Sequence, residues 1–223
     1  MNRRRLPVHA EPAPIEERIG VALQKIALAL RHRAQREAEP RGLSPLQAQL
    51  LALLDARGPL RPSAMAELLA VRKPTITDSV AALERKDLVR RDADPVDARA
   101  QLVSLTGRGR REGRSLDGAS ALLATAADAL GRTERDAFFG SLLKMIHALE
   151  ERGDVPRSSM CASCTQFRPH AHDDAAAPHH CALLDAPLGW GDLRIECAEH
   201  EPIADDTDRA SVWSRFVGGR AAD

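Results

Sequence analysis

Three prolines constrain the fold of this chain more than any other feature. Pro45, Pro62 and Pro74 each open a short stretch whose apolar residues recur at helical spacing. Proline suits the first position of a helix, because the N–H that it lacks would have no partner there. Ser44 adds an N-cap to the first stretch. The sequence therefore predicts three short helices in a row, a helix-turn-helix arrangement. They cover residues 45–57, 62–69 and 74–86.

Two stretches with the composition of short strands follow these helices. Leu88-Val-Arg-Arg and Gln101-Leu-Val-Ser-Leu are joined by the polar turn residues 92–100, which predicts a β-hairpin. Apolar spacing also predicts a long helix over residues 15–38, a long helical stretch from Thr106 to Leu130, and a last helix capped by Thr133. The expected fold is mainly α with a small β-hairpin wing, a winged helix-turn-helix.

The third short helix has the character of a DNA-reading element. Ile76, Val80 and Leu83 form one apolar stripe, which turns small polar side chains toward solvent or a DNA groove. Hydroxyl groups on such a face bond base edges or phosphates, and flanking cations contact phosphates. The candidate DNA-binding residues of this region are Arg72, Lys73, Thr75, Thr77, Asp78, Ser79 and Arg85. An ordinary solvated helix face is the alternative for the helix taken alone.

Three stretches of the chain resemble the MarR family of transcription regulators. They are Ala66-Glu-Leu-Leu, residues 73–91 and residues 94–109, and the D-x-x-D-x-R pattern from Asp94 to Arg99 is the most specific part. The resemblance covers roughly residues 15–152 and implies a DNA-binding regulator, not an enzyme. It also implies a homodimer formed by the first and last helices, which would bind a palindromic site on double-stranded DNA.

The resemblance assigns roles to two residues of the wing. Arg99 matches the arginine that reaches into the minor groove, and Asp97 matches the acid that holds the wing in shape. A surface ion pair between the two is the alternative. The sequence departs from the family at Arg72, where a small capping residue is usual, and at Asp87, where glycine is usual. Aspartate tolerates a left-handed backbone better than most residues, so the second departure is mild.

All four cysteines lie in the last third of the chain, at Cys161, Cys164, Cys181 and Cys197. A C-x2-C pair with two further sulfurs supplies the four ligands of a zinc site or an iron–sulfur cluster, of which we rank the cluster slightly higher. His180 and His200 are alternative ligands, because Cys197-x2-His200 would complete a zinc site of three cysteines and one histidine. Free thiols are the remaining alternative. The histidines of this segment are expected to be solvated. They are His170, His172, His179, His180 and His200.

Charge and composition divide the chain into four parts. Residues 1–152 carry a net charge of +6 and residues 153–223 a net charge of −6, so the basic surface that phosphate binding needs lies in the first part. No apolar run is long enough to span a membrane, and no secretion signal precedes the first helix, so a cytoplasmic protein is expected. The expected parts are a disordered arm (1–14), the winged-helix and dimerisation domain (15–152), a cysteine-rich module (153–203) and a polar acidic tail (204–223). Trp213 and Phe216 of the tail are candidates for docking onto the body.

The sequence thus predicts a dimeric regulator whose cysteine-rich extension senses redox state or metal supply. A MarR-like regulator with a structural zinc module and a small aromatic effector is the leading alternative. A thiol-based or metal-dependent enzyme is less well supported, because no cysteine is paired with a placed base and the H-E-x-x-H and G-x-S-x-G motifs are absent from the sequence.

Overall fold

The structure is a computed structural model that describes residues 12–97, 99–116 and 118–219. The predicted arm is described only at residues 12–14, so the expectation for most of it lies outside the described residues. Contacts between residues group the chain into two compact units. The first holds residues up to Gly58, Ser79–Asp92 and Val103–Thr125, and the second holds Pro59–Asp78, Ala93–Leu102 and the chain from Ala126 onward.

The first unit begins with the helices α1 (Ile15–Ala38) and α2 (Pro45–Arg57), separated by a 3-10 turn, η1 (Glu39–Arg41). Gly42 has a φ of 61°, which lets the chain turn between them. A capping box starts α2, in which Gln47 donates its N–H to the Ser44 hydroxyl and Ser44 donates its N–H to the Gln47 side chain. Both helices have the bounds that the sequence predicts.

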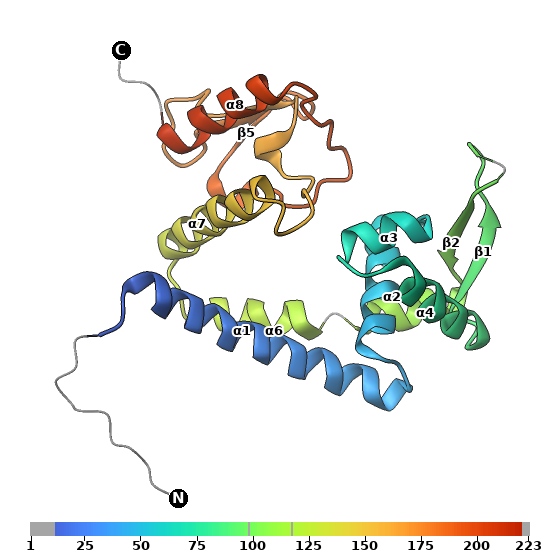
Figure 1. The fold of residues 1–223 in the computed structure, drawn as a ribbon. Helices are drawn as coiled ribbons and strands as arrows, with labels where there is room; N and C mark the ends of the chain where they lie inside the picture. Colours follow the sequence, from blue (N-terminus) through green and yellow to red (C-terminus); the bar gives the residue numbers. More distant parts are fainter. Residues whose placement is uncertain (1–11, 98, 117, 220–223) are drawn as a thin grey trace, which may run out of the picture. The chain divides into compact units, whose positions relative to one another are not determined.

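The helices α3 (Pro62–Leu68) and α4 (Lys73–Arg85) come next in the chain, followed by the antiparallel hairpin of β1 (Val89–Ala93) and β2 (Gln101–Leu105). Figure 1 shows the hairpin extending from the end of α4 as a two-stranded ribbon. Asp87 joins α4 to β1 with a φ of 56°, the left-handed conformation expected at this position. The predicted order of three helices and a wing is confirmed.

The helical stretch after the wing is broken, which the sequence analysis did not foresee. It consists of α5 (Gly107–Arg114) and α6 (Gly118–Ala127), and α5 is followed by a turn at Ser115 and Leu116. Glycines close to both helix ends, Gly113 and Gly118, favour an interruption because glycine is a poor helix former. Gly113 also allows α5 to approach α2 closely, since a Cβ there would lie 3.2 Å from the Leu51 carbonyl oxygen.

In the second unit, α7 (Arg132–Glu151) supplies one wall of the extension's core. Its cap is Gly131, whose N–H donates to the Glu134 side chain 2.8 Å away, and not Thr133 as the sequence predicts. Leu143 is buried in the core, and Phe139 and Ile146 pack against it from the same face of the helix. Phe138, Met145 and Leu149 are exposed.

The extension contains a small antiparallel sheet in the order β3 (Phe167–Arg168), β4 (His179–Cys181) and β5 (Ala186–Leu188). Two 3-10 turns accompany it, η2 (Cys161–Ser163) and η3 (Trp190–Asp192). Met160, Phe167 and Leu193 are buried in one core with Leu143 of α7. The extension has few apolar residues, and they suffice for a core because α7 contributes apolar side chains to it.

The chain ends in a helix, in the segment that the sequence analysis described only as a polar acidic tail. Asp205 accepts N–H bonds from Thr207 and Asp208 and thereby caps α8 (Asp206–Gly218). Phe216 is buried in the core with its ring against that of Phe167, and Trp213 stacks on His147 of α7 with ring centroids 3.6 Å apart. Figure 1 shows α8 lying over the short strands. The predicted docking of Trp213 and Phe216 is therefore confirmed, but through a helix.

Among the residues that the structure describes, no helix is both long and apolar enough to cross a membrane.

Candidate functional site

The helix α4 presents the polar face that the sequence predicts. Ile76, Val80 and Leu83 are fully buried. Most of the candidate DNA-binding residues around them are exposed, and Ser79 is half-buried. The exposed ones are Arg72, Lys73, Thr75, Thr77, Asp78 and Arg85. The Thr77 hydroxyl donates to the Lys73 carbonyl oxygen at 3.0 Å, so its methyl group and its remaining lone pairs are what it can offer to a base.

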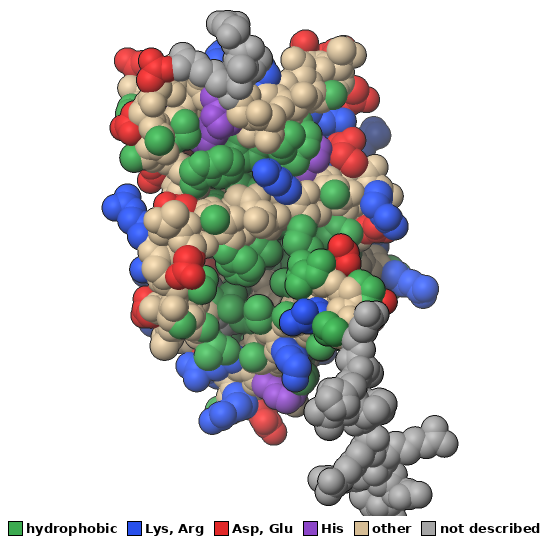
Figure 2. Space-filling model, turned by 90° about the vertical axis from the view of Figure 1, so that its left-hand side faces the viewer, with side chains coloured by type: hydrophobic (Ala, Val, Ile, Leu, Met, Phe, Trp, Pro, Cys, Tyr) green, Lys and Arg blue, Asp and Glu red, His purple; other side chains and the backbone are tan. Residues whose placement is uncertain are grey.

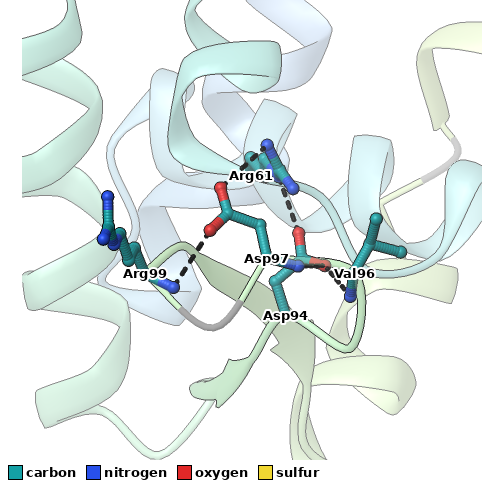
Figure 3. Close-up of polar contacts among 5 residues, drawn as sticks. All are labelled: Arg61, Asp94, Val96, Asp97 and Arg99. Carbon is teal, nitrogen blue, oxygen red and sulfur yellow. Dashed lines mark hydrogen bonds and ion pairs between the residues drawn. The ribbon is translucent and has the colours of Figure 1, made fainter.

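A buried carboxylate organises the turn of the wing. Asp94 accepts N–H bonds from Val96 at 2.8 Å and Asp97 at 3.3 Å, and its other oxygen accepts from Nε of Arg61 at 2.6 Å (Figure 3). The hydrogen bonds from Arg61 and from the Val96 N–H lower the pKa of the Asp94 carboxyl. Arg61, which directly precedes α3, therefore helps to hold the wing, and the sequence analysis did not identify it.

Asp97 and Arg99 occupy the same turn, but no ion pair joins their side chains in the described part of the wing. Asp97 accepts the backbone N–H of Arg99 at 3.1 Å and lies 3.9 Å from the Arg61 guanidinium (Figure 3). The Arg99 side chain is exposed and points away from these carboxylates. Asp97 thus contacts the turn as predicted, while Asp94 makes more of the bonds that fix its shape.

We expect Asp94→Asn to loosen the wing. The asparagine amide is uncharged and has one accepting oxygen, whereas the carboxylate accepts from Arg61 with one oxygen and from two backbone N–H groups with the other. Amide hydrogen exchange should become several-fold faster at Val96 and Asp97, with β-hairpin signals elsewhere retained. Since the pKa of Asp94 is lowered, the wild-type contacts should persist at neutral pH and be lost only when the pH falls below the ordinary aspartate range. Unchanged exchange in the variant would show that Asp94 does not hold the turn.

The four cysteines, which come from three separate segments of the chain, line one small cavity. Cys161, Cys164, Cys181 and Cys197 surround about 30 Å³ of space together with Phe167 and Leu188. All four are free thiols. Burial raises the pKa of the Cys161 thiol, the Arg194 N–H opposes this, and the neighbouring cysteines raise it further. Four thiols that line one cavity are a potential metal-binding donor set, because each can bind a metal once it has lost its proton.

Backbone contacts fix the cysteines from two sides. Cys161 donates its N–H to the Arg194 carbonyl oxygen at 3.0 Å, and the Arg194 N–H returns to the Cys161 sulfur at 3.3 Å. Cys181 faces Phe167 across the sheet, and Cys197 donates its N–H to the Ser159 carbonyl oxygen. Within the described residues, no three His, Cys, Asp or Glu side chains stand at the spacing of a preformed single-ion site.

The alternative histidine ligands are directed elsewhere. The His200 ring bonds the Ser163 hydroxyl at 3.0 Å, and the His180 ring lies 3.2 Å from the His172 ring and 3.6 Å from the Asp185 carboxylate. Neither residue is among those that line the cysteine cavity. The geometry brings together the four-cysteine set that the sequence suggests and not the set of three cysteines and one histidine.

His179 departs from the expectation of solvated histidines. It is fully buried among the rings of Phe167, Trp190 and Phe216, and its Nδ1 accepts the His170 N–H. Burial lowers the pKa of His179 to about 4, so the ring is neutral at neutral pH. Its position two residues before Cys181 places it on the same face of the short strand, as part of the core below the cysteines.

The comparisons with known proteins concern the winged-helix part. Residues 43–100, which hold α2, α3, α4, β1 and the turn of the wing, match the sequence pattern of the MarR family. These residues form a MarR-family domain. With this domain, the chain is a DNA-binding transcription regulator of the MarR type and not an enzyme. No curated protein matches the chain.

Several solved structures resemble this MarR-family chain over part of its length. The MepR–DNA complex of Staphylococcus aureus is 24% identical with a TM-score of 0.51, and it covers 59% of this chain and 97% of its own, which supports the winged-helix fold. A probable transcriptional regulator from Pseudomonas aeruginosa is 28% identical, with a TM-score of 0.47, and the match covers 59% of this chain and 99% of the regulator. The transcriptional regulator Tm0710 from Thermotoga maritima is 24% identical, with a TM-score of 0.43, and the match covers 61% of this chain and 96% of Tm0710. The matches do not extend over the cysteine-bearing C-terminal region, which this chain has in addition to the winged-helix part.

Proposed function

We propose that this MarR-family regulator binds a palindromic operator as a homodimer, with α4 in the major groove and the wing in the adjacent minor groove. The observation that carries the proposal is the exposed Arg99 on a wing turn that Asp94 and Arg61 hold in shape. A narrow minor groove concentrates negative potential and attracts a guanidinium. The solved MepR–DNA complex supports the same use of this fold.

The proposed dimer rests on helices that one chain leaves uncovered. In α1, Ala38 is the one residue buried among the 24 of the helix, while Ile15, Ile19 and Ile26 of its apolar stripe are exposed. In α7, Phe138, Met145 and Leu149 are also exposed. Figure 2 shows hydrophobic side chains lying open on the face that it draws. A second copy of the chain is the partner that suits them, because a two-fold protein matches two half-sites about one DNA turn apart.

We expect Arg99→Ala to weaken operator binding about tenfold and to lower the salt slope by about one for each arginine lost. The control is Arg215→Ala, which removes the same charge from an exposed position in α8, outside the winged-helix elements. Thr77→Ala should relax base preference more than it weakens binding to unrelated DNA. Fluorescence anisotropy across a salt series measures all three. An Arg99→Ala isotherm equal to that of the wild type at every salt concentration would contradict the wing assignment.

We further propose that the extension holds a four-cysteine centre and reports redox state or metal supply to the winged domain. The support is the cavity that all four cysteines line. The cavity is small, and Phe167, Leu183 and Leu188 are part of its wall. A space this small suits a single ion better than a cluster of several iron and sulfur atoms, so the cavity itself does not favour the cluster over zinc. When bound, the centre would supply an oxidisable or removable cross-link between η2, β4 and the segment at Cys197.

The helix α7 is the element through which the extension would act on the dimer. Phe139, Leu143 and Ile146 pack on the extension's core, and the neighbouring face of the same helix carries the exposed Phe138 and Met145. A change in the packing of the first face moves the second, because a helix is rigid across its width. The state of the cysteine cluster would thereby alter the spacing of the two recognition helices.

A small-molecule effector is the second candidate for the signal, with a purely structural metal site in the extension. One observation favours it. A cavity of about 540 Å³ lies between α1, α2 and α5 in the first unit, within the usual range of small-ligand sites. Leu30, Ala48 and Ala52 contribute apolar lining, and Arg31 and Arg114 contribute cations. A regulator of this kind would respond to the ligand equally with and without its metal.

A further inference from the structure

The charge around the cysteine cavity is unfavourable for the centre that the cysteines would hold. A Zn²⁺ ion with four thiolates carries two negative charges in excess, and residues 153–223 add a net charge of −6 of their own. Glu199 lines the cavity and increases the local negative charge. A centre at this place therefore needs a cation beside its ligands, because an uncompensated charge weakens metal–thiolate binding.

Arg194 is in contact with two of the four cysteines. Its backbone N–H donates to the Cys161 sulfur at 3.3 Å, and its guanidinium Nη1 lies 3.9 Å from the Cys197 sulfur. Its carbonyl oxygen accepts the N–H of Cys161, which holds the two segments in register. One residue thus connects the first and the last cysteine and brings a positive charge to them.

The other described arginines of the extension are engaged away from the cavity or make no contact with a cysteine. Arg157 and Arg209 pair with Glu151, and Arg209 also pairs with Asp206. Arg168 donates to backbone carbonyl oxygens of its own loop. Arg215 is exposed in α8. In the part of the extension that the structure describes, Arg194 is the cation whose side-chain contact is a cysteine sulfur.

We propose that Arg194 is a positioning residue for the four-cysteine centre, which holds the Cys161 and Cys197 sulfurs and offsets the excess negative charge on them. This inference rests on the proposed four-cysteine centre and assigns a role within it. Groups just outside the ligand shell orient the ligands and tune metal affinity, typically by a factor of about 10 to 100. Hydrogen bonds to cluster sulfurs also shift the reduction potential.

The test compares metal retention in the full chain, purified without oxygen. Iron and zinc content are measured for the wild type, Arg194→Ala, Arg194→Lys and Arg215→Ala, and each protein is then titrated with a metal chelator. Arg194→Ala should release its metal at about 10-fold to 100-fold lower chelator concentration. Arg194→Lys, which keeps the charge, should fall between the two, and Arg215→Ala should match the wild type. Circular dichroism checks that each variant is folded, as the exposed position of Arg194 leads us to expect.

Three other outcomes overturn the proposal, in distinguishable ways. If Arg194→Ala retains metal as well as the wild type does, the role of the Arg194 side chain is refuted and the four-cysteine centre stands. If Arg194→Ala and Arg215→Ala lose metal equally, the effect is one of overall charge and not of contact with the sulfurs. If the wild type carries neither iron nor zinc, the four-cysteine centre itself is refuted, and the inference about Arg194 with it.

Discussion

Gly109→Ala is expected to prevent stable folding of the first unit, because an added Cβ would make a shorter contact there than at any other glycine whose surroundings the structure describes. A Cβ at Gly109 would lie 1.9 Å from the Leu88 carbonyl oxygen and 2.9 Å from its carbonyl carbon. Those atoms cannot retreat, because the same oxygen accepts bonds from the N–H and the hydroxyl of Thr106. The loss of stability should exceed about 3 kcal/mol, which is the upper end of the usual range for overpacking.

The matched control is Gly107→Ala, two residues earlier in the same helix. The nearest atom to a Cβ there is the far end of the Arg111 side chain at 3.9 Å, which can move. Alanine in a helix is favoured over glycine by roughly 0.5 to 1 kcal/mol, so this variant should be as stable as the wild type or slightly more so. Thermal unfolding followed by circular dichroism measures both. Equal melting temperatures for the two variants would refute the close approach of α5 to the start of β1.

Cys164→Ser is expected to abolish metal binding and to destabilise the extension while leaving the winged helix folded. Cys164 lines the cysteine cavity and is buried in the extension's core. The loss of a ligand should weaken metal binding by more than about 100-fold, because changes just outside the ligand shell already reach that size. Amide exchange should accelerate in β3–β5 and remain slow in α2 and α4. Under our proposal, operator affinity should also cease to depend on redox conditions.

His200→Ala is the control that separates the two ligand sets. In a four-cysteine centre it should retain its metal, because the His200 ring bonds Ser163 and does not line the cavity. Metal analysis and a visible spectrum distinguish the cases, since an iron–sulfur protein is coloured and a zinc protein is not. Loss of metal in His200→Ala with retention in Cys181→Ser would favour a site of three cysteines and one histidine. A Cys164→Ser protein with full metal content and unchanged operator binding would refute the sensing proposal.

Local signals in the sequence were sufficient for the winged-helix part. The bounds of α2 follow from Ser44, Pro45 and Gly58, each of which acts within one turn of its own position. The buried stripe of Ile76, Val80 and Leu83 follows from helical spacing alone. The cap of α7 at Gly131 was missed because Thr133 is the better capping residue by composition.

The features that the sequence did not reveal depend on contacts between distant residues. The Arg61–Asp94 bond joins positions 33 residues apart, and no spacing rule links a residue before α3 to a turn of the wing. The helix α8 is polar overall, so its sequence does not indicate that Phe216 is buried. That burial depends on contact with Phe167 of β3, which is distant in the sequence. Likewise, C-x2-C predicts a ligand pair, but the fold was needed to bring Cys181 and Cys197 to the same cavity.

The central claim is that two copies of this chain bind one DNA duplex through α4 and the wing. Analytical ultracentrifugation of the full chain, alone and with genomic DNA fragments at low ionic strength, tests it most directly. We predict a dimer in the free state and two chains on each bound site, with an affinity that falls steeply as salt is added. A chain that sediments as a monomer and leaves all the fragments unbound at low ionic strength would contradict it.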